Sequence, residues 1–413
     1  MFDVLFTHCC GLDVHKKSVS ACVFRPKVGG TGVERLIRNF GTTTNALQKL
    51  SEWLQELGVT HVAMESTGVY WKPVFNVIEP VVEVWLVNAQ HVKQVPGRKT
   101  DIKDAEWLAS LMRHGLLKPS YIPDVGQRDL RDLTRYRTRL TAERSAASNR
   151  LQKALEDANI KLSSVASDIR GVSSRAMIEA LIAEEPDPEV LAEMARGTLR
   201  RKIPELTEAL TGNVRDHHRF WMHELLQHID ELNERIDMLN QEIQKRTAPY
   251  KDTLERLMEV TGIGRYVAEI ILAEIGPDVT NFPTAKHLAS WACLCPGNNI
   301  SANKRRSGRT RKGQPWLRAA LTQAAWGASR SKDTYLSAQF QRLRVRRGPK
   351  RAAIAVAHSI LVIVYHLLAN PEASYRELGG DYFLQKNKGQ QERRAVNILQ
   401  TLGYQVQLTP VAA

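Results

Sequence analysis

The sequence has few of the features that mark secreted, disulfide-rich or zinc-stabilised proteins. Only five of the 413 residues are cysteines, too few and too irregularly spaced for a disulfide framework. No two of them have the Cys-x-x-Cys spacing, which argues against a structural zinc site. The first residues, MFDVLFTHCCGLDVHKK, lack the charged-then-apolar order of a signal peptide. We therefore expect a protein of the reducing cytoplasm.

Long apolar runs are also scarce, and a single stretch is a candidate transmembrane helix. Residues 352–369, AAIAVAHSILVIVYHLLA, are long and apolar enough to form a transmembrane helix. Two histidines, a serine and many alanines weaken that interpretation, and nothing else in the chain resembles a membrane segment. We expect a buried helix packed beneath the neighbouring basic segment, and no membrane partner.

Positive charge is present in excess and is confined to one segment. The chain has 58 lysines and arginines against 44 acidic residues, a net charge of +14. Residues 301–351 hold 15 of those basic residues and one acid, so the remainder has 43 residues of each sign and is neutral. Binding of a polyanion explains such concentrated charge better than a solvated basic surface does, because each neutralised phosphate releases counterions. The charge therefore predicts nucleic-acid binding and an association with the nucleoid.

The length allows two or three domains, and the first zone, 1–125, reads as an α/β domain. Strands come first and then alternate with helices, which is typical of a mixed sheet. Alternating and continuous apolar patterns predict strands at 9–14, 19–24, 35–40, 61–64 and 81–87. Helical periodicity predicts helices at 44–57, 68–78 and 101–114.

The second zone, 126–250, is helical and heavily charged. An a/d seam with steps of four and three residues predicts a coiled coil; its members are Leu225, Ile229, Leu232, Ile236, Leu239 and Ile243. A weaker seam over 130–154 is interrupted by Arg137 and Arg144. The two seams could pair within one chain or between chains. We favour at least some pairing between chains, which predicts a dimer or tetramer.

The third zone, 251–413, is helical and contains a glycine turn. Gly262 and Gly264 lie between two helical patterns, in Val-Thr-Gly-Ile-Gly at 260–264. Glycines in such a turn let backbone N–H groups approach a phosphate at a helix N-terminus. The segment looks like a helix-hairpin-helix that binds the DNA backbone; a packed helical turn with no ligand is the alternative.

Four carboxylates in the first zone are candidate metal ligands: Asp13, Glu65, Asp101 and Asp104. Asp13 falls within a strand and Glu65 ends one, and an acid in an apolar strand is costly without a partner such as a metal ion. Asp101 and Asp104 share one face of the expected helix, although first-turn acids often serve only as caps. Together the four could hold two Mg²⁺ ions about 4 Å apart for phosphoryl transfer.

Basic residues accompany the carboxylates and could steer phosphates. Lys99 and Lys103 flank the Asp101–Asp104 pair. Glu106 lies two residues beyond Asp104 and should point to another side of the helix. These basic side chains could therefore steer or clamp phosphates at the metal site.

The order Asp, Glu, Asp-x-x-Asp after a strand-rich start resembles the RuvC-like division of the ribonuclease H fold. With the remaining motifs, the chain resembles transposases of the insertion-sequence 110/1111 family, which carry four such acids and a carboxy-terminal serine. The matching segments are GLDVHKKSV (11–19), AMESTGVYW (63–71), VNAQHVKQVPGRKTDIKDAEWLASLMRHGLL (87–117), the glycine turn, LASWACLCPGNNISANKRRSGRTRKGQPWLRAAL (288–321) and RRGPKRAAIAVAHSIL (346–361).

The resemblance implies the roles of specific residues. It makes the four carboxylates metal ligands and places a nucleophilic serine shortly after Pro296, where Ser301 fits best and Ser307 is the rival. Ile300 and Asn303 depart from the family pattern in this loop. No activating base is near Ser301 in sequence, so the carboxylates must reach it across space, from the same or another subunit. The expected nucleic-acid contacts are Lys99, Lys103, Gly262, Gly264, Lys304, Arg305, Arg306, Arg309, Arg311, Lys312, Arg346, Arg347 and Lys350.

The resemblance also implies a partner: a noncoding guide RNA that pairs with target and donor DNA. Base pairing would then supply the specificity, since the sequence offers backbone-binding charge and no clear base-reading module. The expected function is that of a DNA transposase, or recombinase, that forms a phosphoserine intermediate. The first alternative is a metal-only, RuvC-like structure-specific endonuclease in which water attacks. The second is a nucleic-acid binder whose acids are structural.

Overall fold

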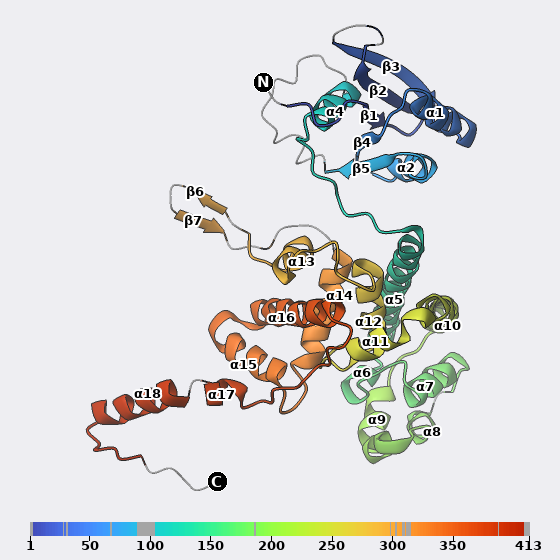
Figure 1. Cartoon of the computed structure of the whole chain (residues 1–413). Coiled ribbons are helices and arrows are strands. Elements are labelled where there is room, and N and C mark those ends of the chain that lie inside the picture. Colours follow the sequence, from blue (N-terminus) through green and yellow to red (C-terminus); the bar gives the residue numbers. More distant parts are fainter. Residues whose placement is uncertain are drawn as a thin grey trace. The chain divides into compact units, whose positions relative to one another are not determined.

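The chain divides into two compact units, Met1–Pro123 and Asp124–Ala413, in a computed structural model (Figure 1). Within residues 3–408 the described chain omits 28, 30–31, 67, 89–103, 186, 298, 302–303, 308–309, 311–314 and 387. Each unit has its own buried core.

The first unit is built on a five-stranded mixed sheet, which confirms the expected α/β class. The strands are β1 (Cys9–Val14), β2 (Ser18–Pro26), β3 (Val33–Gly41), β4 (His61–Glu65) and β5 (Glu83–Val87). Their order across the sheet is β3-β2-β1-β4-β5. β1 to β3 pair antiparallel, whereas β4 runs parallel to both β1 and β5. The pattern-based strands all form, with ends within two residues of those expected.

Helices cover both faces of this sheet, because its strands carry apolar side chains on both sides. The helices are α1 (Thr44–Glu56), α2 (Trp71–Ile78) and α4 (Asp104–Arg113). Cys10 and Leu12 of β1 face the core that contains α1 and α2. Cys9 faces the core that contains α4. A Cβ on Gly11 would stand 2.1 Å from the Ala105 carbonyl oxygen, so only glycine allows α4 this close to β1.

Two long helices form the framework of the second unit. They are α5 (Val125–Asp157) and α10 (Asp216–Thr247), which lie antiparallel, with Arg137 against Asn240 and Arg144 against Asn233. Leu140 of α5 is buried with Leu232 and Ile236 of the predicted seam. The seam that we expected to pair at least partly between chains is thus packed within one chain.

A helical subdomain joins the ends of α5 and α10 and shares their core. Its elements are α6 (Leu162–Val165), α7 (Val172–Ile182), α8 (Pro188–Glu193), η1 (Gly197–Lys202) and α9 (Ile203–Leu210). Leu151 of α5, Met177 of α7 and Leu226 of α10 belong to one buried cluster. Asp187 caps α8, since its side chain accepts from the Glu189 backbone N–H.

The remaining helices pack around one apolar helix. They are η2 (Ala248–Tyr250), α11 (Lys251–Met258), α12 (Arg265–Ile275), α13 (Ala285–Trp291), α14 (Pro315–Ala328), α15 (Tyr335–Arg347) and α16 (Pro349–Ala369). Among the described residues, α16 alone is long and apolar enough to cross a membrane. Val356, Ile360 and Val364 are fully buried against neighbouring helices, and α14 and α15 belong to the basic segment. α16 therefore serves as a core helix, as expected.

Three small elements complete the second unit (Figure 1). A two-stranded hairpin, β6 (Asn299–Ser301) and β7 (Lys304–Ser307), precedes α14. Two helices end the chain, α17 (Tyr382–Lys386) and α18 (Lys388–Thr401). Tyr335 of α15 stacks on Phe383 with ring centroids 5.1 Å apart, which fixes α17 on α15.

Candidate metal site and nucleic-acid interface

Strand register brings two of the predicted acids together. Leu12 of β1 pairs with Met64 of the parallel strand β4, and the next residues on these strands are Asp13 and Glu65. Neighbouring residues on adjacent strands point to the same face of the sheet. Both acids also lie at the carboxyl ends of their strands, where open α/β sheets bind ligands.

The acids project towards the face covered by α4. Leu12 and Met64 point into the core with α1 and α2, so Asp13 and Glu65 point to the opposite side. α4 runs antiparallel to β1 there, since the Arg113 carbonyl accepts from Phe6 N–H and Ala105 lies over Gly11. The first residue of α4, Asp104, is therefore at the Asp13 end of β1. Three of the four predicted acids share one end of one face.

The donor set at this end suits a hard divalent cation, because all three groups are carboxylates. Asp13 is partly exposed at 30%, and its Oδ2 lies 3.1 Å from Nε2 of His15. Within the described ranges, no group of three His, Cys, Asp or Glu side chains is close enough to hold one metal ion. Asp101, Lys99 and Lys103 lie outside the described residues.

Glu106 is separated from these acids, as expected from its position on α4. Its carboxylate forms an ion pair with Arg35 on β3 and is 18% exposed. β3 is the far edge strand of the sheet, two strands away from β1. Glu106 is therefore on the same helix as Asp104, but its carboxylate pairs with Arg35.

The candidate serines lie on the β6–β7 hairpin. Ser301 pairs with Lys304 next to the turn, and Ser307 pairs with Asn299 at the other end of the ladder. The Pro296–Thr310 bridge continues the pairing beyond Ser307. Arg309, Arg311 and Lys312 lie outside the described residues. The backbone thus presents Ser301 and Lys304, Arg305 and Arg306 on one short projecting element.

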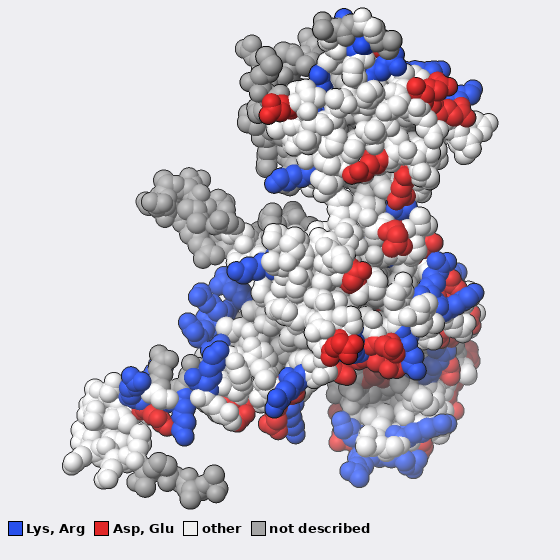
Figure 2. Space-filling model, viewed as in Figure 1, with Lys and Arg blue, Asp and Glu red and all other residues white. Residues whose placement is uncertain are grey.

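A second group of basic residues lies at the corner between α15 and α16. Arg346 and Arg347 end α15, Gly348 turns the chain with a φ of +79°, and Lys350 is in the first turn of α16. All three basic side chains are exposed. Figure 2 shows lysines and arginines gathered over this corner. The predicted contacts at 346, 347 and 350 are therefore accessible to a polyanion.

The glycine turn connects α11 to α12, as the sequence predicts, but its two glycines differ. A Cβ on Gly262, whose φ is +94°, would stand 2.3 Å from the Ala324 carbonyl oxygen of α14. Packing against α14 thus accounts for Gly262 without a phosphate, which was the alternative left open by the sequence. Gly264 begins α12 and has no atom within 4 Å of the place of its missing side chain. Gly264 remains the better candidate for approach to a phosphate.

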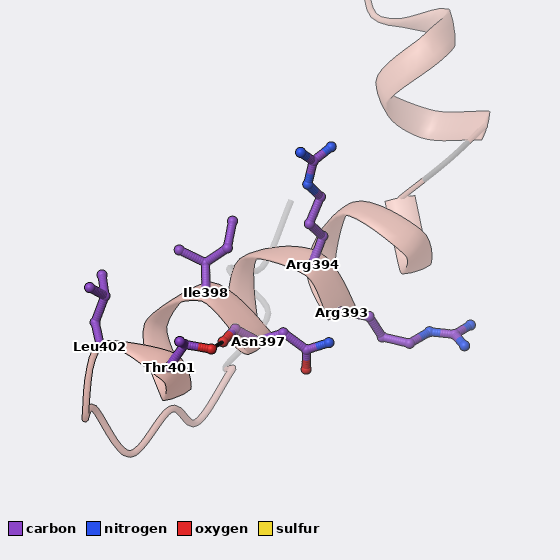
Figure 3. A pocket seen from close by; sticks show the side chains of 6 residues that line it. All are labelled: Arg393, Arg394, Asn397, Ile398, Thr401 and Leu402. Atoms are coloured by element: carbon purple, nitrogen blue, oxygen red, sulfur yellow. Dashed lines mark hydrogen bonds between the residues drawn. The ribbon is translucent and has the colours of Figure 1, made fainter.

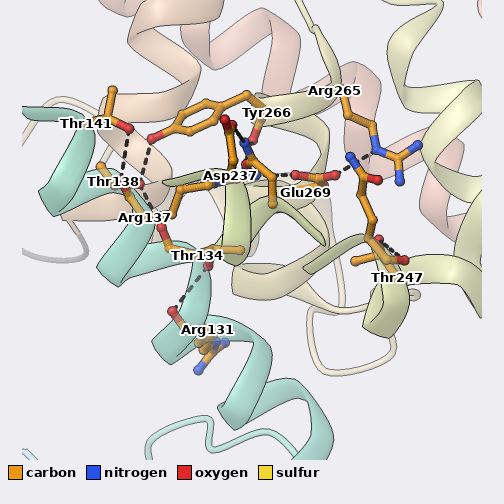
Figure 4. A network of polar contacts seen from close by, with 12 residues as sticks. Arg131, Thr134, Arg137, Thr138, Thr141, Asp237, Thr247, Arg265, Tyr266 and Glu269 are labelled. Atoms are coloured by element: carbon orange, nitrogen blue, oxygen red, sulfur yellow. Dashed lines mark hydrogen bonds and ion pairs between the residues drawn. The ribbon is translucent and has the colours of Figure 1, made fainter. Parts of the chain in front are cut away.

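A buried network of charges joins α5, α10 and α12 (Figure 4). Arg137 is 3% exposed and its guanidinium donates to Glu269 at 2.5 Å and to Asn240 at 3.1 Å. Arg265 reaches the other oxygen of Glu269 at 2.7 Å. The interruption of the apolar seam by Arg137 was the sequence signal for this network, although its partners could not be read from it.

Glu377, which the sequence did not single out, holds the segment after α16 in place through hydrogen bonds. Glu377 accepts hydrogen bonds from the hydroxyls of Thr261 and Tyr375 and from the backbone N–H of Tyr335. Burial opposes ionisation of Glu377, but these hydrogen bonds outweigh it and hold its pKa below the ordinary value. Since Thr261 precedes Gly262, this contact ties the segment to the glycine turn.

Comparison with known proteins gives two family matches. Residues 10–160 match a family model for the DEDD type of IS110 transposase. Residues 254–341 match the transposase family IS116/IS110/IS902. The first range contains the carboxylates, and the second contains the glycine turn, the hairpin and most of the basic segment.

Three curated relatives are similar over most of the chain. A probable family 20 transposase of Pseudomonas aeruginosa is 26% identical over 79% of this chain and 89% of its own length. The transposase for insertion sequence element IS1111A of Coxiella burnetii is 27% identical, covering 70% of this chain and 72% of its own. A putative transposase of Sinorhizobium fredii is 27% identical, with coverages of 72% and 70%.

Proposed function

We propose a function for this chain from one premise: it belongs to the IS110/IS1111 family of transposases, enzymes that cut and rejoin DNA. From this premise we propose that it moves an insertion sequence by means of a divalent metal held by Asp13, Glu65, Asp101 and Asp104, and of a nucleophilic serine, Ser301. The observation that carries the proposal is the strand register, which sets Asp13 beside Glu65 on the face where α4 begins with Asp104.

The mixed sheet supports a ribonuclease H-like, RuvC-like assignment for the first unit. Three antiparallel strands are followed by two parallel ones, and the first acid is on the central strand β1. Such a sheet collects residues that are far apart in sequence at the ends of β1 and β4. Residues 1–125 would then be the catalytic domain, 126–250 the helical linker and 251–413 the domain that presents the serine.

The carboxylates would hold Mg²⁺, whose charge stabilises the phosphate oxygens in the transition state when it is bound. The hydroxyl of Ser301 attacks the phosphorus, an Oγ–P bond forms, and the bond from phosphorus to the departing deoxyribose oxygen breaks. The serine proton leaves, and the departing oxygen gains one, so the step balances. A hydroxyl of another DNA strand then displaces Ser301, and rejoining needs no external energy.

The basic residues would bind the backbones of DNA and of a noncoding guide RNA. The exposed corner at Arg346, Arg347 and Lys350, the N-terminus of α12 at Gly264 and the hairpin offer separate contacts for phosphates. Lys99, Lys103, Arg309, Arg311 and Lys312 are proposed on sequence alone. We expect this machinery to work as a homo-oligomer in the cytoplasm, on the nucleoid.

Trapping the protein on a radiolabelled element end tests the proposal. Denaturing gels should show a covalent protein–DNA species, and peptide mass spectrometry should place the link on Ser301. Ser301→Ala should abolish the species, whereas Ser307→Ala should keep it. Asp13→Asn and Glu65→Gln should each reduce cleavage by about 10³-fold or more, because each removes a carboxylate that holds the metal. Glu106→Gln on the same helix is the matched control and should cut normally.

The same experiment separates the alternatives. If Ser301→Ala cuts at the full rate and no covalent species forms, water is the nucleophile and the chain acts as a metal-only endonuclease. If Asp13→Asn leaves cleavage unchanged, the carboxylates are structural and the proposed site is wrong.

A further inference from the structure

The last described helix, α18, presents a basic and apolar face to solvent. Arg394, Ile398 and Leu402 are spaced by four residues and point to the same side (Figure 3). Together with Arg393, Asn397 and Thr401 they border a shallow hollow of about 600 Å³. Ile398 is 52% exposed and Leu402 is 68% exposed. Apolar side chains grouped on one helix face in this way mark an interaction surface.

A groove between α8 and α9 has the opposite charge. It encloses about 680 Å³ and combines apolar walls with carboxylates; it is lined by Val190, Ile203, Pro204, Asp187, Glu189 and Glu193. No lysine or arginine is among the described side chains that line it. Val190 is 44% exposed, which leaves apolar surface available in the groove.

The carboxylates of the groove are not all equally free to bind a partner. Asp187 caps α8 by accepting from the Glu189 backbone N–H at 2.9 Å. Glu193 lies 3.2 Å from Arg200, and both side chains are about 60% exposed, so this pair is weak and replaceable. Glu189 and Glu193 are therefore the charges that an approaching cation would meet.

We propose that α18 of one copy of the chain docks in the α8–α9 groove of a second copy. The apolar stripe of α18 matches the apolar walls, and its arginines match Glu189 and Glu193, which is the pattern of a helix bound in a groove. Both surfaces lie outside the ranges 10–160 and 254–341 that match the family. The inference identifies a contact for the proposed oligomer and rests on that part of the proposed function only.

The partner is a second copy because α18 is held near α15 of its own chain. The ring stack between Tyr335 and Phe383 fixes α17, and a single residue separates Lys386 of α17 from Lys388 of α18. α15 packs mainly with α14, α16 and α17, whereas α8 packs with α7 and α9. A helix tethered so closely to α15 reaches the groove of a neighbouring chain more readily than its own.

Charge reversal in the full-length protein tests the contact. The helix variant is Arg393→Glu with Arg394→Glu, and the groove variant is Glu189→Lys with Glu193→Lys; Asp187 is kept because it caps α8. Sedimentation velocity of each variant alone should show self-association weakened by about tenfold or more, since like charges then face each other. Lys251→Glu with Lys286→Glu changes the net charge by the same amount as the helix variant, at exposed positions outside both surfaces, and should associate normally.

Mixing the two variants gives the decisive result. In a mixed pair the acidic helix meets the basic groove, and the original helix meets the original groove, so association should return to within about threefold of the wild-type value. Circular dichroism of each variant, and recovery in a chain carrying all four changes, shows that the variants fold.

Three results would overturn the inference. They are a wild-type chain that is monomeric, a helix variant that associates normally, and a mixture that fails to recover while the four-change chain does. The last of these would mean that α18 binds its own chain. Covalent trapping through Ser301 is measured separately, so these results would leave the proposed chemistry standing.

Discussion

Removing Glu269 should destabilise the second unit more than removing Arg137, although the two form one buried ion pair. Both side chains are at most 3% exposed. Breaking such a pair leaves the surviving charge in a medium where it is poorly solvated, which costs about 3–5 kcal/mol. The surviving partner decides where in that range each variant falls.

After Arg137→Met, Glu269 keeps Arg265 at 2.7 Å, and that arginine is 44% exposed and partly hydrated. We therefore expect a loss of about 3 kcal/mol, the low end of the range. After Glu269→Met, Arg137 keeps only neutral acceptors, the Asn240 side chain at 3.1 Å and the Tyr266 carbonyl at 3.4 Å, together with the Tyr266 ring. That variant should lose about 5 kcal/mol.

The double variant, Arg137→Met with Glu269→Met, removes both charges of this pair and should lie within about 1 kcal/mol of the wild type. Hydrogen exchange of α5 and α12 peptides measures the opening free energies without assuming that the whole chain unfolds in one step. If the double variant is as unstable as the sum of the single variants, the coupling is absent and the explanation is wrong.

Three further outcomes follow from individual residues. Gly262→Ala should cost about 2 kcal/mol or more, seen in thermal unfolding, because its Cβ meets the α14 backbone at a positive φ. Burial raises the pKa of Cys9 to about 12, so the folded thiol keeps its proton while an unfolded one titrates near 9. Stability should thus fall between pH 9 and 12, and iodoacetamide at pH 8 should spare Cys9. Glu377→Ala should speed proteolysis of residues 371–381, since it removes the acceptor of five hydrogen bonds, from the hydroxyls of Thr261 and Tyr375 and the backbone N–H groups of Tyr335, Leu378 and Gly379.

The predictions for Gly262 and Cys9 each have a control residue within the chain. Gly264→Ala, with open space around its Cβ position, should change stability by less than about 1 kcal/mol. Cys295 is less buried than Cys9 and should be alkylated first. Since the pKa of Glu377 is lowered, its stabilising effect should be complete above the unfolded value near 4.5 and disappear in acid; an unchanged proteolysis rate in Glu377→Ala would contradict its role.

Local patterns were sufficient to predict the first unit. Alternation in 9–14 and the apolar run at 61–64 fixed which residues form β1 and β4, and the helical period fixed α1. The adjacency of Asp13 and Glu65 could be guessed from their place in strands, but only the pairing of Leu12 with Met64 demonstrates it. The pattern of buried side chains limits the register to shifts by an even number of residues, and the pairing in the fold selects one of them.

Which element packs against a given helix or glycine was harder to predict than the secondary structure itself. The heptad seam of α10 correctly indicated a paired helix, yet the same apolar spacing suits a partner in the same chain or in another. The sequence likewise marked Gly262 without telling a phosphate from a helix backbone as its neighbour. Both ambiguities concern what lies opposite a residue: in the fold, α5 lies opposite the α10 seam and α14 lies opposite Gly262.

The contact between Gly262 and α14 restricts how this protein can change during evolution or engineering. The turn at 260–264 and α14 cannot be altered independently, because a single methyl group on Gly262 would displace α14. Among related elements, the residue at position 262 and the α14 residues that face it should accordingly be substituted in concert.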